Sequence, residues 1–191
     1  GEDLGGSNQL VDAGMITIAY GSASGLTSPV NMHQYSPGVG TNSESGDLFG
    51  ASLASGDING DGYDDVIVGV PGEGISKRDR AGAVHVIYGS ASGASGTGSQ
   101  WFYQNSPGWP GRSETNDRFG SSVAVSDIDG DGIGDLVVGV PGEKLGSHTD
   151  AGQVQIRYNP GDWSQTPASV QTLYQNLAGV QNKVETGDRF G

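Results

Sequence analysis

The feature that most constrains this chain is an internal repeat. The pattern Asp-x-Phe-Gly recurs at spacings of 70 and then 71 residues, beginning at Asp47, Asp117 and Asp188. A nine-residue segment that begins at Asp65 returns almost unchanged at Asp135. A repeat of this length is typical of one supersecondary unit that buries its apolar faces against its neighbours. The chain is therefore expected to be a row of similar units.

Each period contains four short apolar segments separated by turns rich in Gly, Pro and Asp, which predicts four strands per repeat. The segments Val66–Val70 and Leu136–Val140 are apolar almost throughout, as expected of strands covered on both faces. The next segment alternates, with Val84 and Val86 at every second position, so only one of its faces is expected to be buried.

Composition supports a fold built from strands. The 35 glycines leave little room for long helices, and Val and Ile outnumber Leu and Met by 26 to 11. Four-stranded units stacked around an axis make a β-propeller, whereas a β-sandwich would not require a repeat of this length. We predict an all-β fold, a β-propeller of four-stranded antiparallel blades.

The phase of the repeat divides the chain unevenly. Residues 1–48 are expected to form half a blade, 49–118 and 119–189 one complete repeat each, and 190–191 the start of the next. That is about two and a half blades, while closed propellers have about four to eight. We therefore expect the exposed blade faces to be covered by the remainder of the propeller or by self-association.

Charge and composition exclude several classes of protein. The formal charge is −13, from 22 acidic against 9 basic residues, so the phosphates of nucleic acid would be repelled. No apolar stretch approaches the roughly 18 residues of a membrane span, so no membrane insertion is expected. The chain has no cysteine and thus no disulfides or thiolate metal sites.

Two Asp-rich segments indicate metal sites between the first and second strands of successive repeats. Oxygen ligands stand at positions 1, 3, 5 and 9, a backbone carbonyl is available at position 7, and Gly at position 6 allows a tight turn. The candidate ligands are Asp57, Asn59, Asp61, Tyr63 and Asp65 in one segment, and Asp127, Asp129, Asp131, Ile133 and Asp135 in the other.

This donor set suits Ca²⁺, with one ion in each loop, better than Mg²⁺, which keeps its waters and prefers rigid octahedral geometry. Val68 and Val138 stand where an EF-hand has Glu, so these are not EF-hands. The alternative is that Asp, Asn and Gly simply form turns. A cation would relieve the repulsion among the carboxylates of each loop.

The Phe49-Gly50 and Gly69-Val70-Pro71 motifs bracket the first loop, and their copies at 119–120 and 139–141 bracket the second. This arrangement resembles the FG-GAP repeats of the integrin α-subunit propeller, with Val in place of Ala in the second motif. The resemblance implies a seven-bladed propeller braced by Ca²⁺, secreted or at the cell surface, with extracellular recognition as its usual role. Compact loops without cysteine are more similar to a bacterial secreted member.

No constellation in the chain indicates catalysis. The histidines occupy three different repeat positions, Ala23 stands where a nucleophile elbow needs Ser, and the glycine-rich run 93–98 lacks the Lys of a phosphate loop. Glu44 and its equivalents Glu114 and Glu185 recur in every repeat, which favours a role in turn structure over a single catalytic acid. We expect no enzymatic activity from these residues.

Two function classes remain open. The chain is either a non-enzymatic recognition or adhesion module for a protein or glycan ligand, or an accessory propeller of a secreted hydrolase whose catalytic part lies elsewhere. A ligand face is expected opposite the calcium loops, where Trp109 and Arg112 lie among the basic residues Lys77, Arg78, Arg80 and His148. Alternatively, Trp109 covers a blade edge and the charges only solvate the loops.

Overall fold

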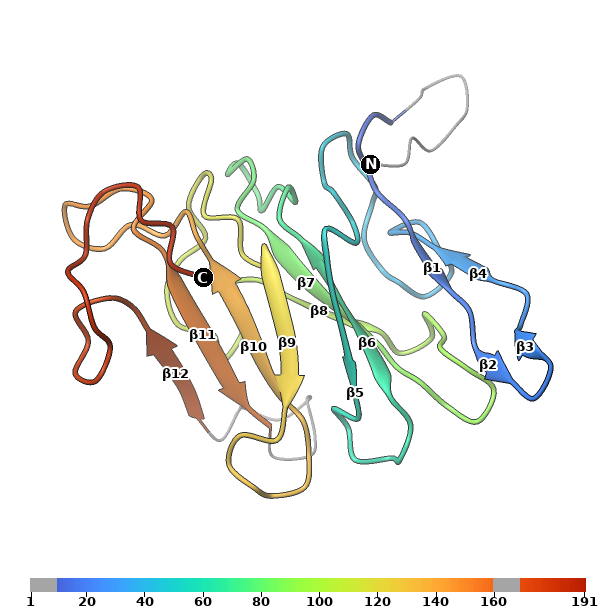
Figure 1. Ribbon diagram of the computed structural model, residues 1–191. Helices are drawn as coiled ribbons and strands as arrows, with labels where there is room; N and C mark the ends of the chain where they lie inside the picture. The colour runs from blue at the N-terminus through green and yellow to red at the C-terminus, as the bar shows by residue number, and fades with distance from the viewer. Residues whose placement is uncertain (1–9, 160–168) are drawn as a thin grey trace.

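The computed structural model describes residues 10–159 and 169–191 of the chain. Within these ranges it contains twelve β-strands and no helix. The first nine residues of the predicted half blade lie outside the described residues. The strands form separate antiparallel sheets that follow one another along an arc (Figure 1). This arrangement confirms the predicted all-β class and is that of part of a β-propeller.

Two of the sheets have four strands, and each has the strands in chain order. The first consists of β5 (Ser52–Gly56), β6 (Asp65–Val70), β7 (Ala83–Ile87) and β8 (Gln100–Phe102). The second consists of β9 (Ser122–Ser126), β10 (Asp135–Val140), β11 (Gln153–Tyr158) and β12 (Ser169–Leu173). The meander of four strands per period is therefore as predicted.

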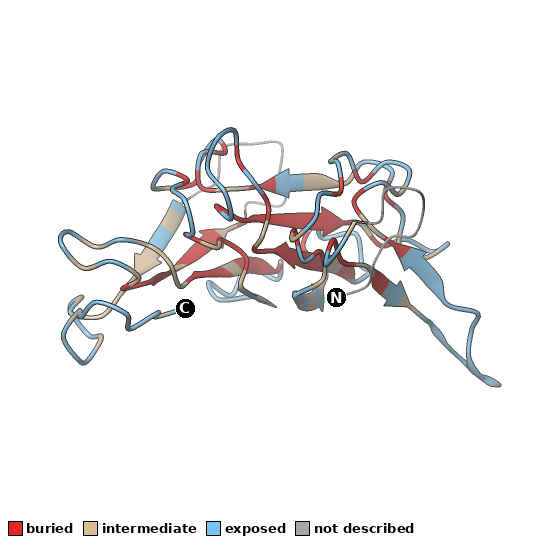
Figure 2. Ribbon diagram, turned by 90° about the horizontal axis from the view of Figure 1, so that it is seen from above, coloured by how far each residue is buried: buried red, intermediate tan, exposed pale blue. Residues whose placement is uncertain are grey.

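The N-terminal part of the chain supplies shorter strands beside the first four-stranded sheet. Here β1 (Ile16–Ile18) pairs with β4 (Val30–Met32), and β2 (Gly21–Ser22) pairs with β3 (Gly25–Leu26) in the hairpin between them. The core lies between consecutive sheets, as the buried strands in Figure 2 show. One core cluster includes Phe119, Trp109 and Leu136, and the other includes Phe49, Val68 and Ile16.

The second strand of each sheet is buried on both faces, as the sequence predicted, since β6 and β10 are buried almost throughout. The prediction of a half-buried third strand is wrong, because all five residues of β7 are buried. His85 on its polar face lies 5.6 Å from the ring of Phe49, and its Nε2 is 3.2 Å from Thr41 Oγ1. Thr41 of the preceding unit helps to cover this face. The alternation along β7 therefore distinguishes a face with apolar contacts from a face with polar contacts, and both are buried.

The same reversal occurs in β11, where Gln155 and Arg157 are buried beside Ile156. The guanidinium carbon of Arg157 lies 4.8 Å from the centre of the Phe102 ring and 5.9 Å from that of Trp109. A cation over aromatic rings is stabilised by their negative faces, which compensates for part of its desolvation. A polar residue in these strands therefore packs against the preceding sheet.

A backbone contact between the Ala-Gly and Phe-Gly motifs joins each repeat to the next. The Phe119 N–H donates to the Ala81 carbonyl at 2.9 Å, and Gly82 forms a parallel bridge with Phe119. A Cβ on Gly82 would lie 2.2 Å from the Phe119 carbonyl oxygen, and its φ is +86°. Only glycine fits this position, and the same contact recurs between Gly14 and Phe49 and between Gly152 and Phe190.

We predict that Gly82→Ala destabilises the chain by at least about 2 kcal/mol, because the added methyl group meets backbone and the φ angle is unfavourable. Gly74→Ala is the control, since nothing lies within 4 Å of a Cβ there. Urea denaturation followed by circular dichroism measures both. Equal stability of the two variants would contradict the prediction, because it would show that the backbone at this contact can move apart without a cost in the free energy of unfolding.

Candidate metal centre

The two Asp-rich segments form adjacent loops at one edge of the sheets. One connects β5 to β6 and the other connects β9 to β10, and both lie at the lower edge in Figure 1. They also contact each other, because the Gly134 N–H donates to the Asp57 carbonyl at 3.0 Å. The sequence thus placed both loops correctly between the first and second strands.

The first aspartate of each loop organises the turn. The Asp57 carboxylate accepts hydrogen bonds from Gly60 N at 2.7 Å and Gly62 N at 2.8 Å. Asp127 accepts the same pair in the second loop, from Gly130 N at 2.7 Å and Gly132 N at 3.0 Å. All four glycines have positive φ angles, as the winding of the chain around a carboxylate requires.

The last aspartate of each loop is fully buried and ties the loop to the end of the third strand. Asp65 accepts from Ile58 N at 3.0 Å and Gly89 N at 2.8 Å. Asp135 accepts from Ile128 N at 2.9 Å and Asn159 N at 2.9 Å. Burial raises the pKa of Asp65, and the nearby charges of Asp61 and Asp57 raise it further.

Three carboxylates meet in the second loop. One oxygen each from Asp127, Asp129 and Asp135 lie within 4.8 Å of one another, a group found in the described residues only at this loop. Asp131 is not part of the group, and its carboxylate accepts from Ile133 N at 2.8 Å. A divalent cation among the three carboxylates would reduce their mutual repulsion, and the all-oxygen donor set fits Ca²⁺.

The first loop does not gather three carboxylates in this way. Asn59 replaces an aspartate there, and its Nδ2 donates to Asp61 Oδ2 at 3.1 Å. The backbone N–H of Tyr63 donates to Asp61 at 2.9 Å, so the loop repeats the turn of its neighbour. The two predicted ligand sets thus share one backbone conformation but differ in how closely their acidic groups approach.

A second acidic feature, not anticipated from the sequence, lies between repeats. Asp47 and Glu73 are both buried, and Gln34 Nε2 donates to Glu73 Oε2 at 2.6 Å. Burial raises the pKa of Glu73 to about 7, with a contribution from the charge of Asp47, whose own pKa burial raises to about 6. The carboxylate pair therefore holds protons at pH values where exposed acids have lost them.

The same pair recurs one repeat later. Gln104 Nε2 donates to Glu143 Oε2 at 2.5 Å, and burial raises the pKa of Glu143 to about 7 and that of Asp117 to about 6. The signal in the sequence was the recurrence of Gln34 as Gln104 and of Glu73 as Glu143. Recurrence at two successive interfaces points to a role in joining the repeats.

The glutamates that recur five residues before Phe-Gly belong to the same turns. The Glu44 N–H donates to Asp47 Oδ2 at 2.6 Å, and the Glu185 N–H donates to Asp188 Oδ2 at 2.6 Å. The Glu114 N–H donates to Asp117 in the same way. The interpretation of these positions as turn structure is confirmed.

The prediction that Trp109 contributes to a ligand surface is wrong. Only 6% of Trp109 is exposed, and its ring packs edge-on against Phe119 with centroids 5.0 Å apart. Its backbone N–H donates to Ser106 at 3.0 Å, which folds the loop inward over the core. The alternative interpretation, in which the tryptophan covers a blade edge, is the correct one, while Arg112 is exposed.

Sheets of this topology, joined by Phe-Gly contacts and carrying Asp-rich loops between their first two strands, define a class of β-propeller repeat. Residues 49–87 and 119–156 match the FG-GAP repeat family. The chain is thus an FG-GAP repeat protein, and over this region it is homologous to integrin α-subunits. None of its described segments forms a helix suited to crossing a membrane.

The chain is similar to parts of much longer proteins. It is 37% identical over 135 residues to the phosphatidylinositol-glycan-specific phospholipase D of Bos taurus, a match that covers 68% of this chain and 16% of that protein. The Dictyostelium discoideum protein of the same name is 34% identical over 61% of this chain and 13% of its own length. Integrin alpha-3 of Mus musculus is 36% identical over 53% of this chain and 9% of its own length.

The acid pairs between repeats predict a pH dependence of stability. Because the pKa values of Glu73 and Glu143 are raised in the folded state, the folded chain binds more protons than the unfolded chain between about pH 4.5 and 7. Their contribution is therefore fully present below that window and is lost as the pH rises through 7. We expect the urea midpoint, measured in EDTA, to fall over this range.

The double variant Glu73→Gln, Glu143→Gln should reduce that dependence, because the neutral amides do not titrate, while Asp47 and Asp117, with pKa values of about 6, still do. Glu185→Gln, at an exposed position, is the matched control and should leave the slope unchanged. A slope that the double variant leaves unchanged would assign the pH dependence to other groups.

Proposed function

We propose that this chain is part of a Ca²⁺-braced extracellular β-propeller that acts as a non-enzymatic recognition or adhesion module for a protein or glycan ligand. The observation that carries the proposal is the group of three carboxylates of Asp127, Asp129 and Asp135 on a loop of an FG-GAP repeat. Hard oxygen donors held by a tight Gly turn are the ligands that Ca²⁺ uses in proteins.

Two ions are proposed, one for each loop. Asp57, Asn59, Asp61 and Asp65 would hold the first together with the Tyr63 carbonyl, and Asp127, Asp129, Asp131 and Asp135 the second together with the Ile133 carbonyl. Two Ca²⁺ ions raise the formal charge of the chain from −13 to −9. Since Asp57 and Gly134 join the loops by a hydrogen bond, ions bound there would stiffen the edge shared by both repeats.

The pattern of titratable groups supports binding over catalysis. Four of the five described acids with raised pKa values occur as equivalent pairs, Glu73 with Asp47 and Glu143 with Asp117, and the fifth is Asp65 in the first Asp-rich loop. A catalytic acid needs one copy at a substrate site, whereas a group that joins repeats is needed at each interface. Among the relatives, the similarity to integrin alpha-3 supports placing the chain outside the cell or at its surface.

A second candidate function rests on the phospholipase D relatives. Their match covers 68% of this chain but only 16% of the Bos taurus protein, so most of that protein lies outside the shared region. The chain could serve in the same way as an accessory propeller of a longer secreted hydrolase. The two functions are distinguished by expressing the full-length gene product, with and without residues 49–156, and assaying hydrolysis of a glycosylated phosphatidylinositol. Hydrolysis by the full-length product supports the accessory role.

For the recognition role, binding of the labelled chain to glycan arrays and to cell surfaces in Ca²⁺ and in EGTA is the direct test. The proposal expects saturable binding that is lost on chelation. A chain that binds Ca²⁺ but recognises nothing on either surface, while the full-length product hydrolyses the lipid, would favour the accessory role.

Removal of calcium should destabilise the chain. Because a ligand that binds only the folded state stabilises it by mass action, saturation at 100 to 1,000 times the dissociation constant adds about 3–4 kcal/mol. EGTA should therefore lower the melting temperature, and Asp129→Ala should lower the calorimetric stoichiometry from two ions to one. Asp79→Ala, in an exposed loop, is the control. An unchanged melting curve in EGTA would contradict the proposal.

We also propose that the blade division at residues 48, 118 and 189 leaves apolar blade faces that the remainder of the propeller or a second copy covers. Exposed apolar faces of a repeat array normally need a capping neighbour. We therefore expect the 191-residue chain to self-associate in light scattering. A monomer with a single sharp calorimetric transition would count against this proposal.

A further inference from the structure

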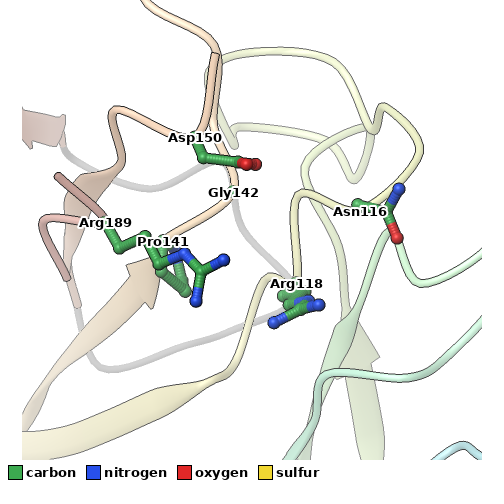
Figure 3. Close-up of a pocket in the computed structure, with 6 residues that line it drawn as sticks. All are labelled: Asn116, Arg118, Pro141, Gly142, Asp150 and Arg189. Carbon is green, nitrogen blue, oxygen red and sulfur yellow. The ribbon is translucent and has the colours of Figure 1, made fainter. Parts of the chain in front are cut away.

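Two arginines from successive repeats line one cavity at the edge opposite the calcium loops. The cavity has a volume of about 200 Å³, and Arg118 and Arg189 each stand directly before a Phe-Gly pair. Figure 3 shows their guanidinium groups on two sides of the space between the repeats, with Asp150 above them. The remaining residues that line the cavity are Asn116, Pro141 and Gly142.

The backbone holds both arginines in place. The Arg118 N–H donates to the Arg80 carbonyl at 3.0 Å, and the Arg189 N–H donates to the Asp150 carbonyl at 3.0 Å. Both residues have φ angles in the left-handed region, 59° and 52°, which residues other than glycine adopt rarely. The contact that joins the repeats therefore sets where each side chain begins.

The side chains keep their donors available. Within the described residues, the hydrogen bonds found for Arg118 and Arg189 involve only their backbone atoms. Each guanidinium carries five N–H donors in a planar fork. With Asp150 as the one acidic lining residue, the cavity has a formal charge of +1 in a chain of charge −13. Such a local excess of positive charge favours an anion.

The size and shape of the cavity narrow the class of anion. At about 200 Å³ it is smaller than the roughly 300–1,000 Å³ of pockets for drug-sized ligands, and so suits a single chemical group. Guanidinium forks pair with carboxylate or phosphate oxygens, and two forks from different repeats can each engage separate oxygens of a tetrahedral phosphate. We propose that this cavity binds a phosphate group of a ligand.

The phosphate site would supply part of the ligand-binding surface in the proposed recognition role, and its biological meaning rests on that role. Phosphate binding by the two arginines does not depend on calcium. Arg118 also lines a neighbouring cavity of about 390 Å³ together with Arg80 and Asp12, so an excess of positive charge continues toward the N-terminal half blade. The residue of that half blade equivalent to Arg118 is Leu48, which has a φ angle of 62°. The fold therefore accepts leucine at this strained position.

This equivalence supplies the test. Inorganic phosphate is titrated into the chain by NMR, at Ca²⁺ concentrations too low to precipitate it. We expect saturable binding centred on Arg118 and Arg189, and at least a tenfold loss of affinity in Arg118→Leu and in Arg189→Leu. Arg118→Lys keeps the charge but not the planar fork, so its affinity for phosphate should lie between those of the wild-type chain and Arg118→Leu.

Arg78→Leu is the charge-matched control, because Arg78 is exposed and lines neither cavity. An equal loss in all three leucine variants, or no saturable binding by the wild-type chain, would overturn the proposal. Melting temperatures and Ca²⁺ affinity are measured on the same samples. If the wild-type chain binds Ca²⁺ but not phosphate, the phosphate site alone is refuted. If the wild-type chain does not bind Ca²⁺, the proposed calcium propeller is refuted.

The source of the phosphate is tested with vesicles. Binding to phosphatidylcholine vesicles that contain phosphatidylinositol, lost in Arg118→Leu, identifies a lipid headgroup as the ligand. Phosphate binding without any vesicle binding identifies a soluble phosphate ester. Vesicle binding that Arg118→Leu leaves unchanged would mean that the lipid is recognised elsewhere, which contradicts this site as the lipid site.

Discussion

The close backbone approach of the Ala-Gly and Phe-Gly motifs is the contact on which the rest of the structure depends. It brings the Phe119 carbonyl so close to Gly82 that there is no room for a side chain at that position. The phenylalanine ring is then buried between the sheets, and the residue before it is held in a left-handed conformation. Spacing of the sheets, burial of the core and direction of the preceding side chain all follow from one glycine contact.

Charge is distributed along each repeat in a definite order. Asp135 begins β10 at the edge that carries the Asp-rich loop, and Pro141 follows the end of β10 at the edge that carries the arginine cavity. Between sheets lie the buried Asp117 and the half-buried Glu143, whose raised pKa values let them carry protons instead of unpaired charge. The proposed cation site and the proposed phosphate cavity thus lie at opposite ends of one strand.

Much of this architecture could be read from the repeat. The turn residues and apolar segments predicted four strands per period, and the pairing of Gly56 with Asp65 places the first loop where the sequence put it. The environment of the third strand could not be predicted, because a period-2 pattern records which face is apolar but not what covers the other. His85 lies on the face that the alternation left uncovered, and it is fully buried beside Phe49 and Thr41.

The sequence by itself determined the number of strands per unit, their order and the composition of the loops, because these depend on local periodicity and on the conformational range of glycine. Only the tertiary structure decided which charged groups meet. The second loop winds back on itself and brings Asp127, Asp129 and Asp135 together, whereas in the first loop, which has the same turn, Asn59 replaces the carboxylate equivalent to Asp129. Arg118 and Arg189, separated by a whole repeat, share a cavity because the stacking of sheets places equivalent positions side by side.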